Sequence, residues 1–240
     1  MVTNFKASYI MPYWHEDHNL RFLKNNINQL LSYPDIEIVV VEVGPVSKLK
    51  NLDMKSKVVF LQSNTWDLGW AFNCGVKHTS SSNIFFGSFE VLPDVNTIKN
   101  QLKEKENYDL IILQDGAKLA DKNYITNKQT TKELSSSTGV YFFDYKSISA
   151  VSGWDENLSG DQLYLFQKHK SFELLNVKIV EDTSCVILPV SIPEDNKKDE
   201  IFEKIIDLKQ DKLKLYLNKQ NKKITNPNKY RKIPLLKYHV

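Results

Sequence analysis

The chain has 240 residues, 41% of them hydrophobic and 25% charged, which are ordinary proportions for a globular protein of one large or two small domains. A mean hydropathy of −0.40 and the lack of a long apolar run exclude a membrane-spanning helix, and the first residues lack the pattern of a signal peptide. Two cysteines are too few for a disulfide scaffold or a four-ligand zinc site, so we expect a cytoplasmic protein in a reducing setting.

The net charge of +3 is unevenly distributed. Residues 208–240 contain ten lysines and arginines against the single acid Asp211, which gives this segment +9 and leaves −6 for the other 207 residues. Such a segment suits an anionic partner or surface, and it equally suits a solvated, lysine-rich helix. Both interpretations stay open at the level of sequence.

The first hundred residues alternate predicted strands and helices in the order β-α-β-β-α-β. The six segments are 6–12, 16–33, 36–43, 57–61, 66–80 and 83–91. Residues 36–43 are β-branched and mostly apolar, which is typical of a central parallel strand. Alternating strands and helices with short connections predict an α/β fold with a mainly parallel sheet.

The second half continues the alternation and then changes in composition. Helices are predicted over 95–106, 146–152 and 161–171, and strands over 108–114, 139–145, 177–180 and 184–190. After Pro193 the chain becomes rich in charged and amide residues, with helical apolar spacing over 198–220 and an irregular last twenty residues. This predicts a domain over 1–193 and a basic helical tail over 194–240.

Three common nucleotide and hydrolase motifs are missing from the sequence. It has no G-x-x-x-x-G-K-S/T loop, no G-x-G-x-x-G after the first strand and no G-x-S-x-G elbow. These observations argue against a P-loop enzyme, a dinucleotide-binding Rossmann domain and an α/β-hydrolase.

Four segments, taken in order, resemble one known family. They are the first two strands, ending in Pro12-Tyr13 and Glu42, the helix at 69–78, the stretch 84–94 and the block 139–163. Together they span residues 7 to 165 and resemble nucleotide-sugar-dependent glycosyltransferases of the GT-A fold, in particular family 2 and galactosyltransferase-like members. The piece Trp154-Asp155-Glu156 ahead of Gly160-Asp161 is the most specific match.

The resemblance implies a GT-A-like α/β fold, with a mixed, mainly parallel sheet flanked by helices. Residues 1–100 would form the nucleotide-sugar half and 101–193 the acceptor half. The residues that would bind the nucleotide-sugar are Pro12, Tyr13, Glu42, Asp67, Trp70, Asn73, Lys77, Ser88 and Glu90. Those that would bind the acceptor are Trp154, Asp155 and Glu156.

Asp161 occupies the family's position for the base that takes the proton of the acceptor hydroxyl, the step that inverting sugar transfer requires. Purely structural roles remain possible alternatives for several of these residues. Asp161 and Asp67 are also suited to capping helices, Asn73 to satisfying buried backbone groups, and Trp154 to filling the core.

The family's metal-binding Asp-x-Asp is degenerate here. The aligned triplet is Ser88-Phe89-Glu90, which leaves Glu90 as its one carboxylate, and the stretch 185–189 lacks the histidine that many relatives supply. Hard cations such as Mn²⁺ and Mg²⁺ prefer several carboxylate oxygens. We therefore expect reduced or absent metal dependence, with Lys77 among the candidate cations for the leaving diphosphate.

The resemblance implies a glycosyltransferase that moves a sugar from a nucleotide-diphosphate sugar, most simply a UDP-sugar, to an acceptor hydroxyl with inversion. The favoured acceptor is a bacterial surface glycan or lipid-linked saccharide, with the basic 208–240 segment at an anionic surface, peripheral to the membrane. One alternative is a phage enzyme that glycosylates hydroxymethylcytosine in DNA. Another is an inactive GT-A-fold binding subunit.

Overall fold

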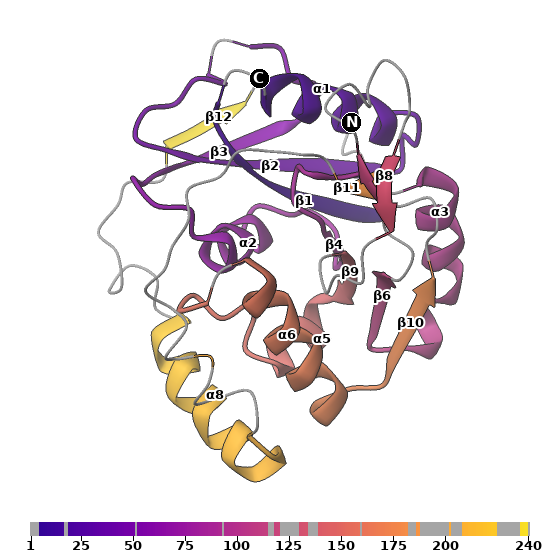
Figure 1. The fold of residues 1–240 in the computed structure, drawn as a ribbon, viewed down its shortest axis with the longest axis vertical. Helices are drawn as coiled ribbons and strands as arrows, with labels where there is room; N and C mark the ends of the chain where they lie inside the picture. Colours follow the sequence, from indigo (N-terminus) through magenta and orange to yellow (C-terminus); the bar gives the residue numbers. More distant parts are fainter. Residues whose placement is uncertain are drawn as a thin grey trace.

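The computed structural model describes most of the chain as one α/β arrangement (Figure 1). The described residues are 5–16, 19–50, 52–92, 94–114, 118–120, 130–133, 139–158, 160–181, 186–187, 202, 208–224 and 236–239. The predicted domain boundary after residue 193 lies outside them.

Eight of the described strands form one twisted sheet in the order β10-β6-β9-β4-β1-β2-β3-β12. They are β1 (Ala7–Trp14), β2 (Ile36–Gly44), β3 (Lys57–Gln62), β4 (Asn83–Phe86), β6 (Leu110–Gln114), β9 (Val140–Asp144), β10 (Val177–Glu181) and β12 (Leu236–His239). Parallel pairing joins β4, β1, β2 and β3 and also β6 and β10, whereas β9 and β12 run antiparallel to their neighbours. The predicted mixed, mainly parallel sheet is confirmed.

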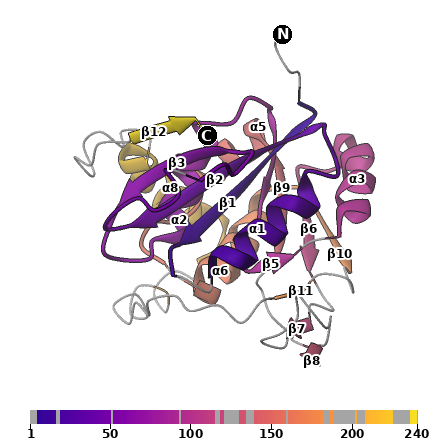
Figure 2. The same cartoon turned by 90° about the horizontal axis from the view of Figure 1, so that it is seen from above.

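Helices cover both faces of the sheet, as buried parallel strands require. Every residue of β2 is buried, because α1 (Asn19–Leu30) lies on one face of β1–β3 and α2 (Leu68–Val76) on the other (Figures 1 and 2). The buried positions of α1 recur at helical spacing and include Phe22, Leu23, Ile27 and Leu30. The remaining described helices are α3 (Val95–Glu104), η1 (Lys105–Asn107), α5 (Tyr145–Ala150), α6 (Gly160–Leu174) and α8 (Gln210–Ile224).

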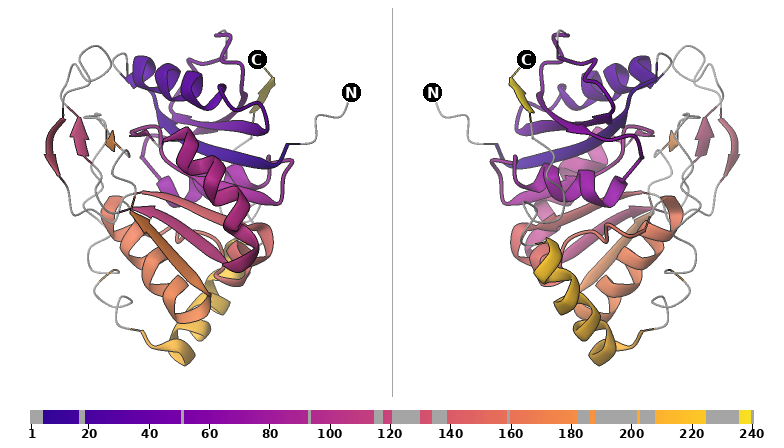
Figure 3. Two further views of the ribbon diagram at one scale, coloured as in Figure 1. Left: turned by 90° about the vertical axis from the view of Figure 1, so that its right-hand side faces the viewer. Right: turned by 90° about the vertical axis from the view of Figure 1, so that its left-hand side faces the viewer.

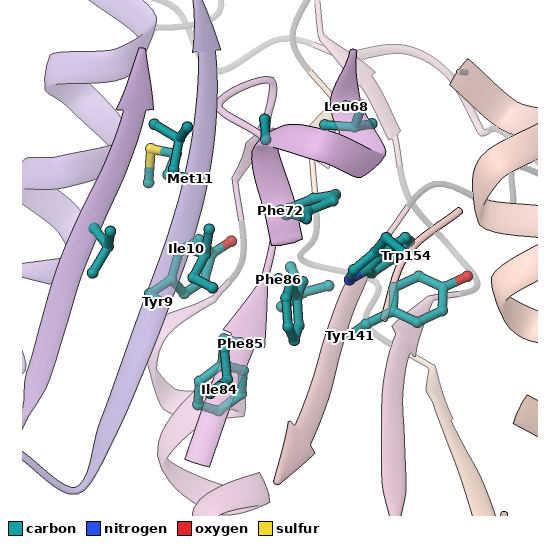
Figure 4. Packing of buried hydrophobic residues seen from close by; sticks show 14 of the residues in the cluster. Tyr9, Ile10, Met11, Leu68, Phe72, Ile84, Phe85, Phe86, Tyr141 and Trp154 are labelled. Carbon is teal, nitrogen blue, oxygen red and sulfur yellow. The ribbon is translucent and has the colours of Figure 1, made fainter. Parts of the chain in front are cut away.

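Aromatic side chains fill the space between the sheet and the helices on the α2 side (Figure 4). Phe72 of α2 packs against Trp154 with ring centroids 4.6 Å apart, and Phe86 and Tyr141 lie at 5.5 Å and 5.3 Å from the same tryptophan. On the opposite face of the sheet, Phe85 of β4 stacks on Phe142 of β9 at 3.9 Å. Aromatic contacts on both faces therefore tie the parallel half of the sheet to the reversed strand β9.

A second, smaller sheet lies beyond the carboxyl ends of the main strands (Figure 3). It contains β5 (Val91–Leu92), β7 (Lys118–Ala120), β8 (Thr130–Glu133) and β11 (Val186–Ile187). The predicted single strand over 83–91 is wrong: β4 ends at Phe86, and the chain turns at 87–90 before β5 joins the other sheet. Gly87 permits that turn, since a Cβ there would lie 2.0 Å from the Tyr9 hydroxyl.

The C-terminal region contributes to the fold in two places. α8 packs against α6, and its Leu213 and Leu217 are buried, as the predicted apolar spacing requires. Strand β12 pairs antiparallel with β3 at the sheet edge, so the prediction of an irregular C-terminus is wrong for residues 236–239. None of the helices that the structure describes combines the length and apolar character needed to cross a bilayer.

Candidate active site

The candidate site lies where the parallel strands β1–β4 end, since the carboxyl ends of parallel strands meet at one edge of a sheet. The turn after β4 continues alongside β1: the amide of Gly87 donates to the carbonyl of Ile10 at 3.2 Å, and that of Phe89 to the carbonyl of Pro12 at 3.2 Å. Tyr13 meets Phe89 edge-to-face at 5.1 Å. The structure thus brings together four predicted nucleotide-sugar residues: Pro12, Tyr13, Ser88 and Glu90.

Ser88 and Glu90 form a buried polar pair in this turn. The Ser88 hydroxyl donates to the Glu90 carboxylate, and both side chains are almost fully shielded from solvent. Burial raises the pKa of Glu90, and the hydrogen bond from Ser88 only partly opposes this. Asn26 of α1 holds the same turn by donating to the carbonyl of Val91 at 2.7 Å.

Asp161 lies in the first turn of α6, directly after Gly160, whose φ of +50° a glycine accommodates best. Its side chain is exposed, and its negative charge contributes to the raised pKa of Glu90. The same two carboxylates, together with burial as the main cause, raise the pKa of the Tyr164 hydroxyl. The predicted base and the predicted metal-ligand position are therefore electrostatic neighbours, although they are 71 positions apart.

The segment of residues 153–157, here called the 153–157 loop, leads into α6 and is anchored by Asn73 of α2. The Asn73 amide donates to the carbonyl of Trp154 at 2.8 Å and to the carboxylate of Glu156 at 3.0 Å, and its oxygen accepts the amide N–H of Trp154 at 2.9 Å. The alternative role foreseen for Asn73, satisfying backbone groups, is the one seen here. Asn73 therefore links α2 to the 153–157 loop.

The three predicted acceptor residues have different environments. Trp154 is fully buried in the aromatic core, which is the alternative position foreseen for it, and its contact with an acceptor sugar stays a prediction. Asp155 is 3% exposed and is bonded by Asn157 and by Tyr216 of α8. Glu156 is half-buried and held by Asn73. Among these three, Glu156 has the most accessible side chain.

Glu42 lies near the carboxyl end of β2, and Asp67 directly precedes α2 at the same edge of the sheet. The buried Glu42 carboxylate accepts hydrogen bonds from the Ser47 hydroxyl at 2.7 Å and from the amides of Lys48 and Leu49 at 2.7 Å and 3.0 Å. It therefore shapes the loop after β2, and its contact with a nucleotide stays a prediction. Asp67 is buried at the N-cap position of α2 but makes no side-chain capping bond, and Trp70 is 7% exposed within that helix.

Lys77 is the one predicted nucleotide-sugar residue that the structure does not bring to this edge. It ends α2 and is exposed, and the next residue, His78, accepts a hydrogen bond from Lys57 at the start of β3. Since β3 starts at the amino edge of the sheet, Lys77 lies at the edge opposite to Glu90. An open pocket of about 520 Å³ also lies at this amino edge, lined by residues that include Ile36, Ile38 and Lys57.

The donor set at the candidate site fits a divalent cation poorly. Among the described residues there is no group of three His, Cys, Asp or Glu side chains that could hold a metal ion. One carboxylate oxygen of Glu90 already accepts a hydrogen bond from the Ser88 hydroxyl. Burial also favours the protonated form of the Glu90 carboxyl group, which is a weak ligand for a hard cation.

Three residues near the site were missed at the level of sequence. Lys170 of α6 is 1% exposed and donates to the carbonyl of Gly153, and its burial lowers its pKa to about 7. Tyr164 has a buried hydroxyl whose pKa is raised by burial and also by the charge of Glu90, and the Tyr216 hydroxyl of α8 donates to Asp155. The sequence could have placed Lys170 on the buried side of α6, because it follows Leu163 and Phe166 at helical spacing. It could not have identified the carbonyl of Gly153 as the hydrogen-bond partner of Lys170.

Comparisons with known proteins establish the fold class. No model of a protein family matches the sequence, and no curated protein matches it. The S. aureus protein TarS, residues 1–349 in complex with UDP-GlcNAc, is similar in structure with a TM-score of 0.62 at 14% identity over 93% of this chain and 72% of that one. The mannosyltransferase PcManGT from Pyrobaculum calidifontis, in complex with GDP-Man and Mn²⁺, has a TM-score of 0.52 at 11% identity over 91% and 71%. At these identities the likeness shows that the chain has a GT-A-like fold.

Proposed function

We propose that this protein is a glycosyltransferase that uses a nucleotide-diphosphate sugar, with Asp161 as its catalytic base. The observation that carries the proposal is the position of the Ser88–Glu90 turn at the carboxyl edge of a GT-A-like sheet, near enough to Asp161 for the charge of Asp161 to act on Glu90. In open α/β sheets, ligands bind outside the carboxyl ends of the strands. The structures of TarS with UDP-GlcNAc and of PcManGT with GDP-Man support a nucleotide-sugar donor, and a UDP-sugar is the donor we propose.

The proposed reaction inverts the anomeric centre. The exposed Asp161 carboxylate takes the proton of an acceptor hydroxyl while that oxygen attacks the anomeric carbon, and the bond from this carbon to the diphosphate oxygen breaks. The nucleoside diphosphate leaves with the bonding electron pair. Because the Ser88–Glu90 pair fits a cation poorly, we propose that transfer depends weakly or not at all on Mn²⁺ or Mg²⁺.

The acceptor proposed is a bacterial surface glycan or lipid-linked saccharide, met by a peripheral protein at the cytoplasmic face of a membrane. Lys209, directly before α8, and Lys212 and Lys214 of α8 are exposed, and this helix packs on α6, which carries Asp161 in its first turn. An anionic surface would attract such a helix. Tighter binding to duplex DNA than to anionic vesicles at equal salt would favour DNA glycosylation instead.

The test compares the wild-type protein with Asp161→Asn, and uses Asp211→Asn, an exposed acid in the first turn of α8, as the control for loss of one charge. Melting temperatures with uridine, guanosine, cytidine and adenosine diphosphates and their sugars identify the donor, because a ligand of the folded state stabilises it. Hydrolysis of that donor is then followed with manganese and with chelator. We expect Asp161→Asn to keep donor binding and to lose at least ~100-fold in turnover, while Asp211→Asn behaves as the wild type.

Each contrary result has a definite meaning. A donor that binds but is not turned over by the wild type would indicate a GT-A-fold binding subunit, and no donor binding would remove the proposal. Activity lost in chelator and restored by manganese would refute weak metal dependence.

A further inference from the structure

Helix α8 is built into the folded unit through several contacts with α6. Leu213 and Leu217 are 0% and 4% exposed, and the Tyr216 ring meets Phe166 of α6 edge-to-face at 5.9 Å. At the start of the helix, the carbonyl of Leu208 lies 3.0 Å from Nε2 of His169, within hydrogen-bond distance. Helix α8, the described helical part of the basic segment, is therefore a packed neighbour of α6, which carries Asp161 (Figure 1).

From this position Tyr216 reaches into the 153–157 loop. Its hydroxyl donates to Oδ2 of Asp155 at 2.7 Å, across 61 positions of sequence. The other carboxylate oxygen, Oδ1, accepts the backbone amide and the side-chain amide of Asn157 at 2.8 Å and 3.1 Å. The carboxylate is 3% exposed, so the Tyr216 hydroxyl provides a hydrogen bond that water would otherwise have to supply.

Other anchors of this loop act on its backbone or on Glu156. Asn73 of α2 bonds both backbone groups of Trp154, and Lys170 of α6 bonds the carbonyl of Gly153. Burial is the main influence on the pKa of Lys170 and lowers it, and the charge of Asp155 partly opposes this effect. The Asp155 carboxylate is thus the point where loop, α6 and α8 meet.

We infer that Tyr216 is a positioning residue of the acceptor half, which fixes the 153–157 loop and through it the start of α6. The inference rests on the proposed function for its chemical consequence. Asp161 follows Asp155 by six positions, so movement of the loop moves the base relative to the acceptor. A displacement of about 1 Å is enough to slow transfer greatly while donor binding at the sheet edge is kept.

The role inferred for Tyr216 does not depend on the positive charge of α8. The lysines Lys212 and Lys214 are exposed and suit an anionic partner, whereas Tyr216 faces the protein. Deletion of residues 208–240 would therefore impair transfer even to an uncharged acceptor, because it removes the hydroxyl that holds Asp155.

The experiment compares Tyr216→Phe with Tyr145→Phe. Phenylalanine keeps the ring contact with Phe166 and removes only the hydroxyl, and Tyr145 is 56% exposed on α5, so its variant controls for loss of a phenol. Three quantities are measured on the full chain: the ratio of sugar transfer to donor hydrolysis, the KM for the donor, and amide hydrogen exchange over residues 153–161.

For Tyr216→Phe we expect exchange over 153–161 to accelerate about fivefold to tenfold, with exchange in β1 and β2 unchanged. The transfer-to-hydrolysis ratio should fall at least ~10-fold at an unchanged donor KM. Unchanged local exchange would overturn the inference, and so would a uniform acceleration across the protein, because that indicates general destabilisation. If the wild type uses no donor, the proposed function fails, but the exchange data still decide whether Tyr216 fixes the loop.

Discussion

Gly69 of α2 packs directly against the 153–157 loop, and replacing it with alanine tests how tightly this loop is placed. A Cβ at residue 69 would lie 2.2 Å from the carbonyl oxygen of Asp155 and 3.0 Å from its carbonyl carbon. Ordinary contacts begin near 3.4 Å, so helix and loop must separate by about 1.2 Å. Both clashing groups belong to the backbone, and a rotamer change of a flexible side chain cannot relieve the overlap.

The expected cost follows from this separation. Overpacking of this kind destabilises proteins by about 1–3 kcal/mol, although the better helix propensity of alanine offsets up to about 1 kcal/mol of it. Because Asn73 and Lys170 hold the same loop, the shift is transmitted to the start of α6 and Asp161. We expect Gly69→Ala to lose about 1–2 kcal/mol of unfolding free energy and ~100-fold in sugar transfer.

Urea unfolding gives the stability of the variant, and transfer and donor hydrolysis are measured on the same preparations. Gly44→Ala is the matched control, because a Cβ at the end of β2 meets only the carbonyl oxygen of Val46, at 3.8 Å. The control should stay within about 0.5 kcal/mol of the wild type. A Gly69→Ala protein with wild-type stability and wild-type transfer would show that the loop accommodates the methyl group and would refute the reasoning.

Two further predictions concern buried ionisable groups. The pKa of Lys170 is about 7 in the folded protein and 10.5 when unperturbed, so between these values the unfolded chain binds more protons and stability rises with pH. Lys170→Met should lose this slope, which is up to about 1.4 kcal/mol per pH unit, and equal slopes in urea unfolding from pH 7 to 9 would contradict it. The raised pKa of Glu90 has the opposite consequence for the pH dependence of stability. Above pH 4.5 the folded protein keeps the Glu90 proton that the unfolded chain loses, so the free energy of unfolding falls as pH rises. Glu90→Gln still accepts from Ser88 and should gain in melting temperature over the wild type from pH 5 to 8, and a pH-independent difference would contradict this cause.

Much of the fold could be predicted from the sequence, because strand and helix periodicity is local. The β-branched run of β2 and the apolar spacing of α1 identify a central strand and an amphipathic helix without knowledge of their partners. The order of elements in the first hundred residues then predicts a parallel sheet and the edge at which its strands end. That Pro12, Ser88 and Glu90 belong to a site at this edge was implied by the resemblance to GT-A-fold glycosyltransferases, since the predicted strand over 83–91 would have contained Ser88 and Glu90.

The tertiary structure alone decided which side chains at that edge face each other. Trp154 is a core residue because Phe72, Phe86 and Tyr141 surround it, and Asn73 bonds the 153–157 loop across 81 positions of sequence. Tyr216 bonds Asp155 across 61 positions. No local pattern encodes such pairs, because their meeting depends on how helices pack on the sheet. The sequence by itself therefore determined the α/β scaffold and the location of the candidate site, and packing determined the partners and roles of its residues.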